Sequence, residues 1–297
     1  MDYSGNPCAR WHSPVPRAVT VDSKLIGATQ PSLIMATGLR LYVVKFCDFS
    51  LAHGLMSEVI GTELMSQMGL PVPEWSPIEF TATFIDDHPE IWYRSSTGGR
   101  GIPPRPGIHF GSRLTLSGHG HTYQIIPGAW ADRVSNRRDF IGALLLDLWT
   151  NNCDRRQCLF VSDNHSPALR AVFIDHDWMF GGHLMNEKTV PRRCMAGNPR
   201  LYEGVWTEEV IEHWKNVIDC IDGACLDRIF ALVPQEWATP SQLRLARQQL
   251  ASRKRRLGTW MTEATQVLKS GRFTPLPNPR PALLSHDHLW LQSPSEA

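Results

Sequence analysis

The sequence predicts an α+β protein with two lobes, a small β-rich N-terminal lobe that carries one main helix and a mostly helical C-terminal lobe. At 297 residues the chain is long enough for two lobes with a sizeable core. Short β-type runs separated by glycines fill the first third, whereas long apolar helical runs dominate after about residue 122. Hydrophobic residues at 42% and charged residues at 20% are typical of a globular protein, so disorder of the whole chain is excluded.

The N-terminal lobe is predicted over residues 19–95, after an irregular arm at 1–18 that is rich in Pro, Ser and Trp. Three short runs broken by Gly27 and Gly38 are typical of a β-meander, and two further runs complete a sheet of about five strands. The five predicted strands are residues 18–22, 31–36, 39–46, 75–85 and 90–96.

One helix is predicted between these strands, over residues 52–70. Leu55, Val59 and Thr62 recur there at helical spacing, and Gly69 followed by two prolines ends the pattern. This helix should pack on the sheet.

The C-terminal lobe is predicted over residues 122–272, with a Gly- and Pro-rich linker or lid at 96–121 before it and a tail at 273–297 after it. Its first helix, at 135–152, has an almost wholly apolar body that must be buried. A β-hairpin and three more helices should follow. The hairpin is predicted at 157–161 and 170–175, and the helices at 207–219, 223–231 and 239–268.

Composition also limits the partners and the compartment. A formal net charge of +1 provides no overall attraction to nucleic acid or to an anionic membrane. Seven cysteines without a C-x-x-C pair argue against a disulfide scaffold and favour a reducing compartment. The start of the chain does not resemble a signal peptide, and no run approaches ~18 apolar residues. We therefore expect a cytoplasmic protein with no nucleic-acid or membrane partner.

Two further features are set aside. His109, His119 and His121 lie in the glycine-rich segment without a Cys or an acid at ligand spacing, so a flexible loop is favoured over a metal site. The basic run at 244–256 distributes its charges around a helix, which favours a solvated helix over a phosphate-binding surface.

Four charged residues appear in the order in which a kinase uses them: a strand lysine, a helix glutamate, an aspartate after a buried helix and an aspartate after a hairpin. They are Lys45, Glu58, Asp154 and Asp175. Phosphoryl transfer needs a cation on the nucleotide phosphates, carboxylates that hold Mg²⁺, and an acceptor for the hydroxyl proton. Each of these roles has a candidate in the sequence.

The lysine and the glutamate are candidates for an ion pair. Lys45 ends an apolar strand, and Glu58 lies on the apolar stripe of the helix, where it needs a cation partner to remain charged. Glu63 lies on the same helix, and periodicity alone does not choose between the two glutamates.

The two aspartates flank the predicted hairpin. Asp154 lies in a polar loop directly after the buried helix, and Asp175 follows an apolar strand, so the hairpin can bring both carboxylates to one place. Paired carboxylates suit Mg²⁺. A metal-dependent hydrolase that uses Asp154, Asp175 and Asp177 is a further alternative.

Several stretches together resemble the HipA-like kinases, bacterial-type enzymes whose fold is related to protein kinases and phosphatidylinositol kinases. The matching stretches, which cover much of residues 24–182, are GATQPSLI, LYVVKF, SEVIGTELMSQMGLPVP, LLLDLWTNNCDRRQCLFV and FIDHDWMF. The resemblance implies a bilobal protein-kinase-like fold and an enzyme that uses ATP and Mg²⁺. It also favours Glu58 over Glu63, from the spacing to the Gly-Leu-Pro ending of the helix.

The resemblance assigns a role to each residue. It implies that Lys45 contacts the nucleotide phosphates, Glu58 orients Lys45, Asp154 is the catalytic base and Asp175 binds Mg²⁺. A turn would cover the phosphates as a glycine-rich loop does. Its residues are Gly27, Ala28, Thr29, Gln30 and Ser32.

The sequence departs from the family pattern at one position. Family members commonly have an asparagine five residues after the catalytic aspartate as a second metal ligand, whereas Leu159 stands there, and Gln157 is the nearest amide that could replace it. The leading prediction is a phosphotransferase that acts on a protein Ser/Thr or on a small-molecule hydroxyl. The alternative is a kinase-fold binding or scaffold protein that has lost turnover.

Overall fold

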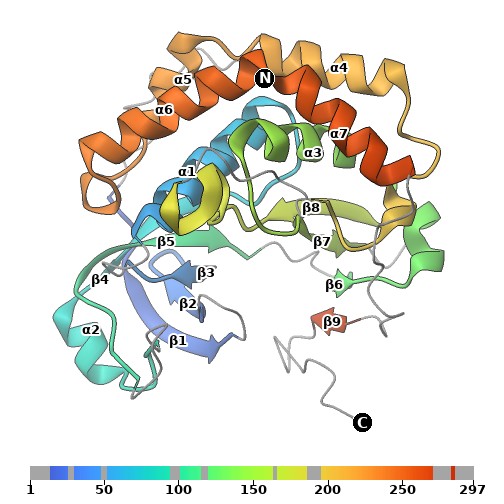
Figure 1. Ribbon diagram of the computed structural model, residues 1–297. Helices are drawn as coiled ribbons and strands as arrows, with labels where there is room; N and C mark the ends of the chain where they lie inside the picture. Colours follow the sequence, from blue (N-terminus) through green and yellow to red (C-terminus); the bar gives the residue numbers. More distant parts are fainter. Residues whose placement is uncertain are drawn as a thin grey trace.

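The structure is a computed structural model that describes residues 14–25, 30–47, 52–93, 101–114, 120–162, 166–185, 195–269 and 282–284. An antiparallel sheet lies on one side of the molecule, and most of the helices lie on the other (Figure 1). The long helices α1 (Ala52–Gln67) and α3 (Asp139–Thr150) lie at the centre, between the sheet and the outer helices. This is the two-lobed arrangement that the sequence predicts.

The N-terminal lobe contains a five-stranded sheet in the order β1-β2-β3-β5-β4, with every neighbouring pair antiparallel. The first three strands confirm the predicted meander. The strands are β1 (Ala18–Lys24), β2 (Ser32–Ala36), β3 (Arg40–Lys45), β4 (Trp75–Phe80) and β5 (Gly107–Arg113).

The prediction of the fifth strand at residues 90–96 is wrong. β5 comes from the segment 96–121, which the sequence predicts to be a linker or lid, and it lies between β3 and β4. At Gly111 an added Cβ would lie 2.5 Å from Ile78 of β4, so this glycine serves the close approach of two strands. His109 of β5 is buried rather than part of a flexible loop. At the predicted strand 90–96, Tyr93 forms an isolated bridge with Ile102.

The predicted strand 75–85 ends earlier than expected, because a short helix begins inside it. β4 stops at Phe80, and α2 (Ala82–Asp87) follows. The hydroxyl of Thr81 accepts a hydrogen bond from the backbone N–H of Phe84 at 3.1 Å, which caps the first turn of α2. The residues after Phe80 have a β-type composition, but the N-cap at Thr81 starts a helix there.

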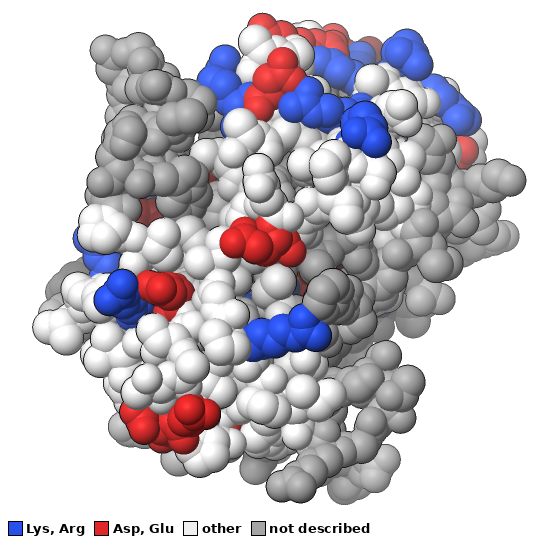
Figure 2. Space-filling model, turned by 90° about the vertical axis from the view of Figure 1, so that its left-hand side faces the viewer, with Lys and Arg blue, Asp and Glu red and all other residues white. Residues whose placement is uncertain are grey.

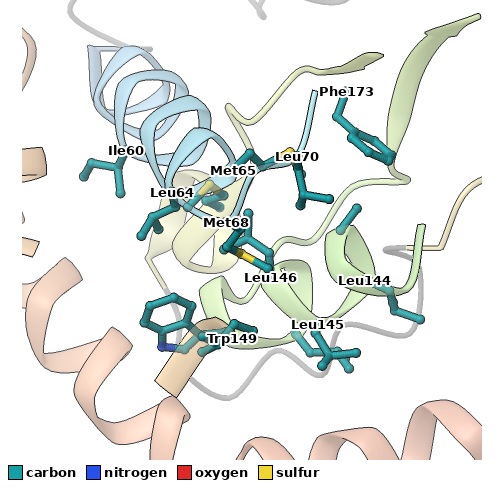
Figure 3. Close-up of a cluster of buried hydrophobic side chains, with 14 of the residues drawn as sticks. Ile60, Leu64, Met65, Met68, Leu70, Leu144, Leu145, Leu146, Trp149 and Phe173 are labelled. Atoms are coloured by element: carbon teal, nitrogen blue, oxygen red, sulfur yellow. The ribbon is translucent and has the colours of Figure 1, made fainter. Parts of the chain in front are cut away.

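Helix α1 confirms the predicted helix but is buried on all its faces. Every residue from 54 to 65 is buried, so α1 is a core element rather than a surface cover. Its apolar side chains meet those of α3 and Phe173 (Figure 3). α1 thus belongs to one hydrophobic core with the C-terminal helices, although it precedes β4 and β5 in the sequence.

The C-terminal lobe contains a second sheet, in the order β8-β7-β6-β9. The predicted hairpin is present as β7 (Gln157–Val161) and β8 (Arg170–Ile174). The structure adds β6 (Thr122–Ile125), and it adds β9 (Ala282–Leu284) within the predicted tail.

Four helices cover the outside of this lobe. α4 (Glu208–Asp219) and α5 (Gly223–Phe230) lie where the sequence predicts them. The third predicted helix is divided into two helices in the structure. They are α6 (Pro240–Arg255) and α7 (Leu257–Lys269), and they are separated at Arg256. Among the helices in the described part of the chain, none is both long and apolar enough to cross a membrane. Short 3-10 turns connect these elements at Gly128–Arg133 (η2), Met179–Leu184 (η3), Pro199–Leu201 (η4) and Gln235–Trp237 (η5).

Aromatic side chains join the two lobes at η5. Trp237 is fully buried, and its indole Nε1 donates to the carbonyl oxygen of Ile108 in β5 at 3.1 Å. The rings of Trp75 and Phe110 lie 6.4 and 6.3 Å from the ring of Trp237. β4 and β5 are therefore joined to the helical lobe, and β5 pairs with β3.

Two cations of the basic run on α6 bind neighbouring segments of the chain. Arg247 forms an ion pair with Asp227 of α5, and Lys254 donates to the carbonyl oxygen of Ile221 at 3.0 Å. Figure 2 shows basic and acidic residues side by side along the upper edge of the face it presents, rather than a patch of one sign. These cations join α6 to its neighbours.

Candidate functional site

One ammonium group and three carboxylates meet where β3, α1 and the end of β8 approach one another. Lys45 Nζ donates to Glu58 Oε1 and to Asp175 Oδ1, the latter at 2.6 Å. Asp177 Oδ2 lies 3.6 Å from the same nitrogen. We call these four residues the lysine cluster. Three of the four side chains, those of Lys45, Glu58 and Asp175, come from residues that the sequence predicts to act together.

The local fold explains how these side chains are presented. Lys45 is the last residue of β3 and pairs with Phe110 of β5, so its side chain starts from a fixed strand end. Glu58 lies in the middle of the buried helix α1. Asp175 follows β8 with φ of 67°, in the left-handed region that residues other than glycine rarely adopt. The chain thus turns sharply at Asp175 and presents Asp175 and Asp177 to Lys45.

The charges in the lysine cluster do not balance, and the pKa values show the consequence. Burial alone would lower the pKa of Lys45, but Asp175, Asp177 and Glu58 hold it well above its usual value. Burial would raise the pKa of Asp175, but the ammonium of Lys45 holds it below its usual value. Burial and the carboxylates of Asp175 and Glu58 raise the pKa of Asp177 to about 8, although Lys45 opposes this. The ionised form of Asp177 is therefore disfavoured in the cluster.

The three carboxylates have the chemistry of a divalent-cation site. One oxygen from each of Glu58, Asp175 and Asp177 lies within 4.8 Å of the others. Carboxylate oxygens are hard ligands, which Mg²⁺ and Mn²⁺ prefer, and a bound dication would remove the repulsion that raises the pKa of Asp177. The residues present therefore fit such an ion. The hydrolase alternative grouped Asp154 with Asp175 and Asp177, whereas among the described residues Glu58 takes that place.

The two glutamates of α1 have different partners in the structure. Glu63 is also buried, but its Oε1 accepts a hydrogen bond from the indole Nε1 of Trp75 at 2.8 Å. Glu58 pairs with Lys45. Glu58, which the resemblance favoured, is thus the glutamate that contacts Lys45, and its role in a site stays a prediction.

Asp154 lies in a loop that begins where α3 ends, after Asn151 with φ of 56°. Its Oδ1 accepts from the backbone N–H of Arg155 at 2.7 Å, and its Oδ2 lies 3.4 Å from Gln157 Nε2, which donates to it. Gln157 is exposed and pairs in the hairpin with Ile174, the residue before Asp175. The structure thus brings Asp154 and Gln157 together at the base of the hairpin that leads to Asp175.

The position of the missing asparagine is apolar in the structure. Leu159 is the central residue of β7, is only 7% exposed, and pairs with Val172 of β8. The side chain therefore contributes to the hairpin and offers no oxygen to a cation. Gln157 remains the amide that could replace the asparagine.

The predicted phosphate-covering turn is only partly described. Gly27, Ala28 and Thr29 lie outside the described residues. Gln30 has φ of 48°, and Ser32 is buried at the start of β2 with no hydrogen-bond partner for its Oγ among the described atoms. The contact of this turn with a nucleotide stays a prediction.

Sequence reasoning missed a second buried charge pair, between Asp147 of α3 and Arg156 of the loop. Arg156 Nε donates to Asp147 Oδ2 at 2.9 Å, and Arg156 Nη2 donates to Asp147 Oδ1. A signal was available, because an acid within the apolar run GALLLDLW of a buried helix needs a cation partner.

No sequence-family description and no curated protein matches the chain. Among solved structures, the chain is similar to the proinflammatory kinase CtkA of Helicobacter pylori, with 12% identity, a TM-score of 0.53, and coverage of 84% of this chain and 96% of that one. It is also similar to a Golgi casein kinase, with 12% identity, a TM-score of 0.48, and coverage of 86% and 74%. HipA of Shewanella oneidensis MR-1, from its complex with HipB and operator DNA, has 13% identity, a TM-score of 0.47, and coverage of 90% and 69%.

The likeness to CtkA is the one that carries the assignment of fold, because the other two scores lie below 0.5. CtkA is a kinase, and the sequence resemblance implied a kinase-like fold. The chain therefore has the bilobal α+β fold of protein-kinase-like proteins.

Proposed function

We propose that this protein is an ATP- and Mg²⁺-dependent phosphotransferase that transfers a phosphoryl group to a protein Ser/Thr or to a small-molecule hydroxyl. The observation that carries the proposal is the lysine cluster, in which Lys45 bridges Glu58 and Asp175 at the junction of the two lobes. A kinase needs this set of groups: a cation for the phosphates, a glutamate that orients it, and a carboxylate for the metal.

Each residue of the cluster has a distinct task under this proposal. Lys45 neutralises charge on the nucleotide phosphates, and Glu58, only 3% exposed in its side chain, holds the ammonium in place. Asp175 and Asp177 hold the Mg²⁺, with Gln157 as a further candidate ligand from the adjoining strand. The bound Mg²⁺ would supply charge neutralisation at the transferred phosphate.

Asp154 is the proposed acceptor of the hydroxyl proton. It is half-buried, and the amide of Gln157 and the backbone N–H of Arg155 each donate to one of its carboxylate oxygens. These bonds fix the direction of the carboxylate while leaving lone pairs for a substrate hydroxyl.

One observation favours a second candidate function, a kinase-fold protein that binds nucleotide without turnover. Leu159 is buried in β7 at the position where the family commonly has a metal-binding asparagine. A site with fewer metal ligands could still bind a nucleotide but would stabilise the transition state less.

Nucleotide binding is tested by thermal unfolding of the full chain with ATP, in the presence and absence of Mg²⁺. We expect wild type to be stabilised by about 2.7 kcal/mol when ATP is at 100 times its dissociation constant, and Asp175→Asn to lose the Mg²⁺-dependent part. Glu63→Gln is the matched control, because Glu63 is a buried acid of the same helix that bonds Trp75 instead of Lys45. A wild-type protein that gains no stability from ATP and Mg²⁺ would contradict the proposal.

Turnover is tested separately, by transfer of labelled phosphate from ATP to the protein itself and to model Ser/Thr peptides and small alcohols. We expect Asp154→Asn to abolish transfer while it preserves the stabilisation by ATP. Transfer that persists in Asp154→Asn would remove the base assignment. Stabilisation by ATP with no transfer or hydrolysis in wild type would favour the binding protein.

A further inference from the structure

Arg156 forms a fully buried, two-pronged ion pair with Asp147, and the exposed fractions of the two side chains are 1% and 0%. Two of its guanidinium nitrogens, Nε and Nη2, are used by this pair. The planar guanidinium fork matches a carboxylate in this geometry, which a lysine ammonium cannot reproduce. Asp147, on the central helix α3, thus anchors Arg156 in one orientation.

The third nitrogen of Arg156 points to the proposed metal-binding segment. Nη1 donates to the carbonyl oxygens of Ile174 and Asp175 at 3.0 and 3.1 Å. It also lies 3.3 Å from His176 Nδ1. One side chain therefore contacts three consecutive residues of the segment that carries Asp175 and Asp177.

This segment has an unfavourable backbone conformation that its surroundings must maintain. The φ of 67° at Asp175 lies in the left-handed region, which is uncommon at residues other than glycine and which neighbouring contacts can stabilise. His176 also packs against α1, where a Cβ added at Gly61 would lie 2.5 Å from His176 Cβ. The segment is thus held between Arg156 and α1.

The same carboxylate also supports the loop of the proposed base. Asn152 Nδ2 donates to Asp147 Oδ1 at 3.0 Å, and Asn152 Oδ1 accepts from the backbone N–H of Asp154 at 3.2 Å. Asp147 therefore links the backbone of Asp154 to that of Asp175, through Asn152 on one side and Arg156 on the other.

We propose that Arg156, anchored by Asp147, is a positioning residue that holds the backbone of Asp175 in the orientation that presents its carboxylate to a divalent cation. The cation-binding part of this inference rests on the proposed function. The clamping of the segment by Arg156 stands on the contacts alone.

The test compares Arg156→Lys with wild type in the full chain. Lysine keeps the positive charge beside Asp147, but one ammonium cannot donate to the carboxylate and to both carbonyl oxygens as the fork does. Arg253→Lys is the matched control, because Arg253 is also buried and donates to two carbonyl oxygens of α3, those of Leu148 and Trp149. The double variant Asp147→Asn/Arg156→Gln, which leaves no unpaired charge, replaces Arg156→Lys if that variant does not fold.

Amide hydrogen exchange by mass spectrometry tests the clamp without any ligand. We expect exchange in residues 174–179 to be at least about tenfold faster in Arg156→Lys than in Arg253→Lys, after both are corrected for their global stability. Equal exchange in this segment in the two variants would overturn the inference.

Titration with Mn²⁺, followed by the electron paramagnetic resonance signal of the free ion, tests the link to the site. We expect Arg156→Lys to weaken Mn²⁺ binding roughly 10- to 100-fold and Arg253→Lys to leave it unchanged. Unchanged Mn²⁺ affinity in Arg156→Lys would overturn the positioning role. A wild-type protein that binds no Mn²⁺ would instead count against the proposed function, and the exchange experiment would then decide the clamp by itself.

Discussion

Two buried charge clusters lie close together in the sequence and in the fold, yet they differ in their balance of charge. The pair Asp147–Arg156 has one acid and one base, and the remaining donors of the guanidinium meet acceptors. The lysine cluster has one base and three acids. Both are removed from water to a large extent, so burial does not distinguish them.

The difference separates a structural ion pair from a candidate site. In the balanced pair each charge has a partner, and removal of either side chain would leave the other charge buried without one. In the lysine cluster, burial and the neighbouring carboxylates together raise the pKa of Asp177. A further cation would therefore stabilise this arrangement. Imbalance of charge, rather than burial alone, therefore distinguishes the candidate site from the structural ion pair.

The largest expected effect comes from breaking the balanced pair. Asp147→Ala leaves the guanidinium of Arg156 buried without its carboxylate, and we expect the free energy of unfolding to fall by about 3–5 kcal/mol. Urea denaturation measures this. The control Asp227→Ala removes an exposed partner of Arg247 and should cost at most ~1 kcal/mol. If the free energy of unfolding falls by a similar amount in the two variants, the buried pair stabilises the fold no more than an exposed pair does.

His109 is buried without a charge, unlike the two charge clusters. We expect this histidine to make the stability of the protein sensitive to acid. Burial lowers the pKa of His109 to about 4. The Nδ1 of its ring accepts a hydrogen bond from the backbone N–H of Cys47, and Nε2 lies 2.9 Å from the carbonyl oxygen of Arg105. Between pH ~6.5 and ~4 the unfolded chain binds a proton that the folded chain does not, so stability falls as the pH falls, by about 3 kcal/mol in total.

The measurement is the free energy of unfolding from pH 7 to pH 4 in wild type and in His109→Gln. The variant should show a shallower decline over this window, whatever its stability at pH 7. Parallel curves for the two proteins would contradict the assignment of the acid sensitivity to His109.

The imbalance itself is tested by Asp177→Asn in the metal-free protein. Because the pKa of Asp177 is raised to about 8, the folded protein retains a proton that the unfolded chain loses above pH ~4, and wild type therefore loses stability as the pH rises from ~4 to ~8. We expect Asp177→Asn to be more stable than wild type at pH 8, on the order of 2 kcal/mol, because asparagine has no proton to lose.

Chemical denaturation in the presence of a chelator, at pH 5 and pH 8, measures this difference. The advantage of the variant should be larger at pH 8. An advantage that is equal at the two pH values, or a variant less stable than wild type at pH 8, would show that the excess of carboxylate is not a source of instability.

The smallest effect on stability is expected at Gln157, at the exposed edge of the same region. Gln157→Ala should change the free energy of unfolding by no more than about 0.5 kcal/mol, because the side chain is exposed and its bond to Asp154 is long. If Gln157 is a metal ligand, the Mg²⁺-dependent stabilisation by ATP should fall in this variant. Unchanged stabilisation would remove Gln157 from the metal site.

The elements that could be predicted from the sequence are those with a local signature. α1 and the hairpin β7–β8 have clear periodicity and clear ends, and both lie where the sequence predicts them. β5 was missed because its glycines are typical of a loop, and only the approach of β4 explains Gly111. The separation of α6 from α7 at Arg256 has no comparable signal within the apolar pattern.

The sequence by itself determined the order of Lys45, Glu58, Asp154 and Asp175 and the kinase-like fold that this order implies, because residue type and spacing along the chain are local properties. The tertiary structure decided which charges meet: Asp177 joins Lys45, Glu63 turns to Trp75, and Arg156 connects Asp147 to Asp175. The reason is physical. Coulomb energy and desolvation depend on distance and burial, and only the folded chain defines either.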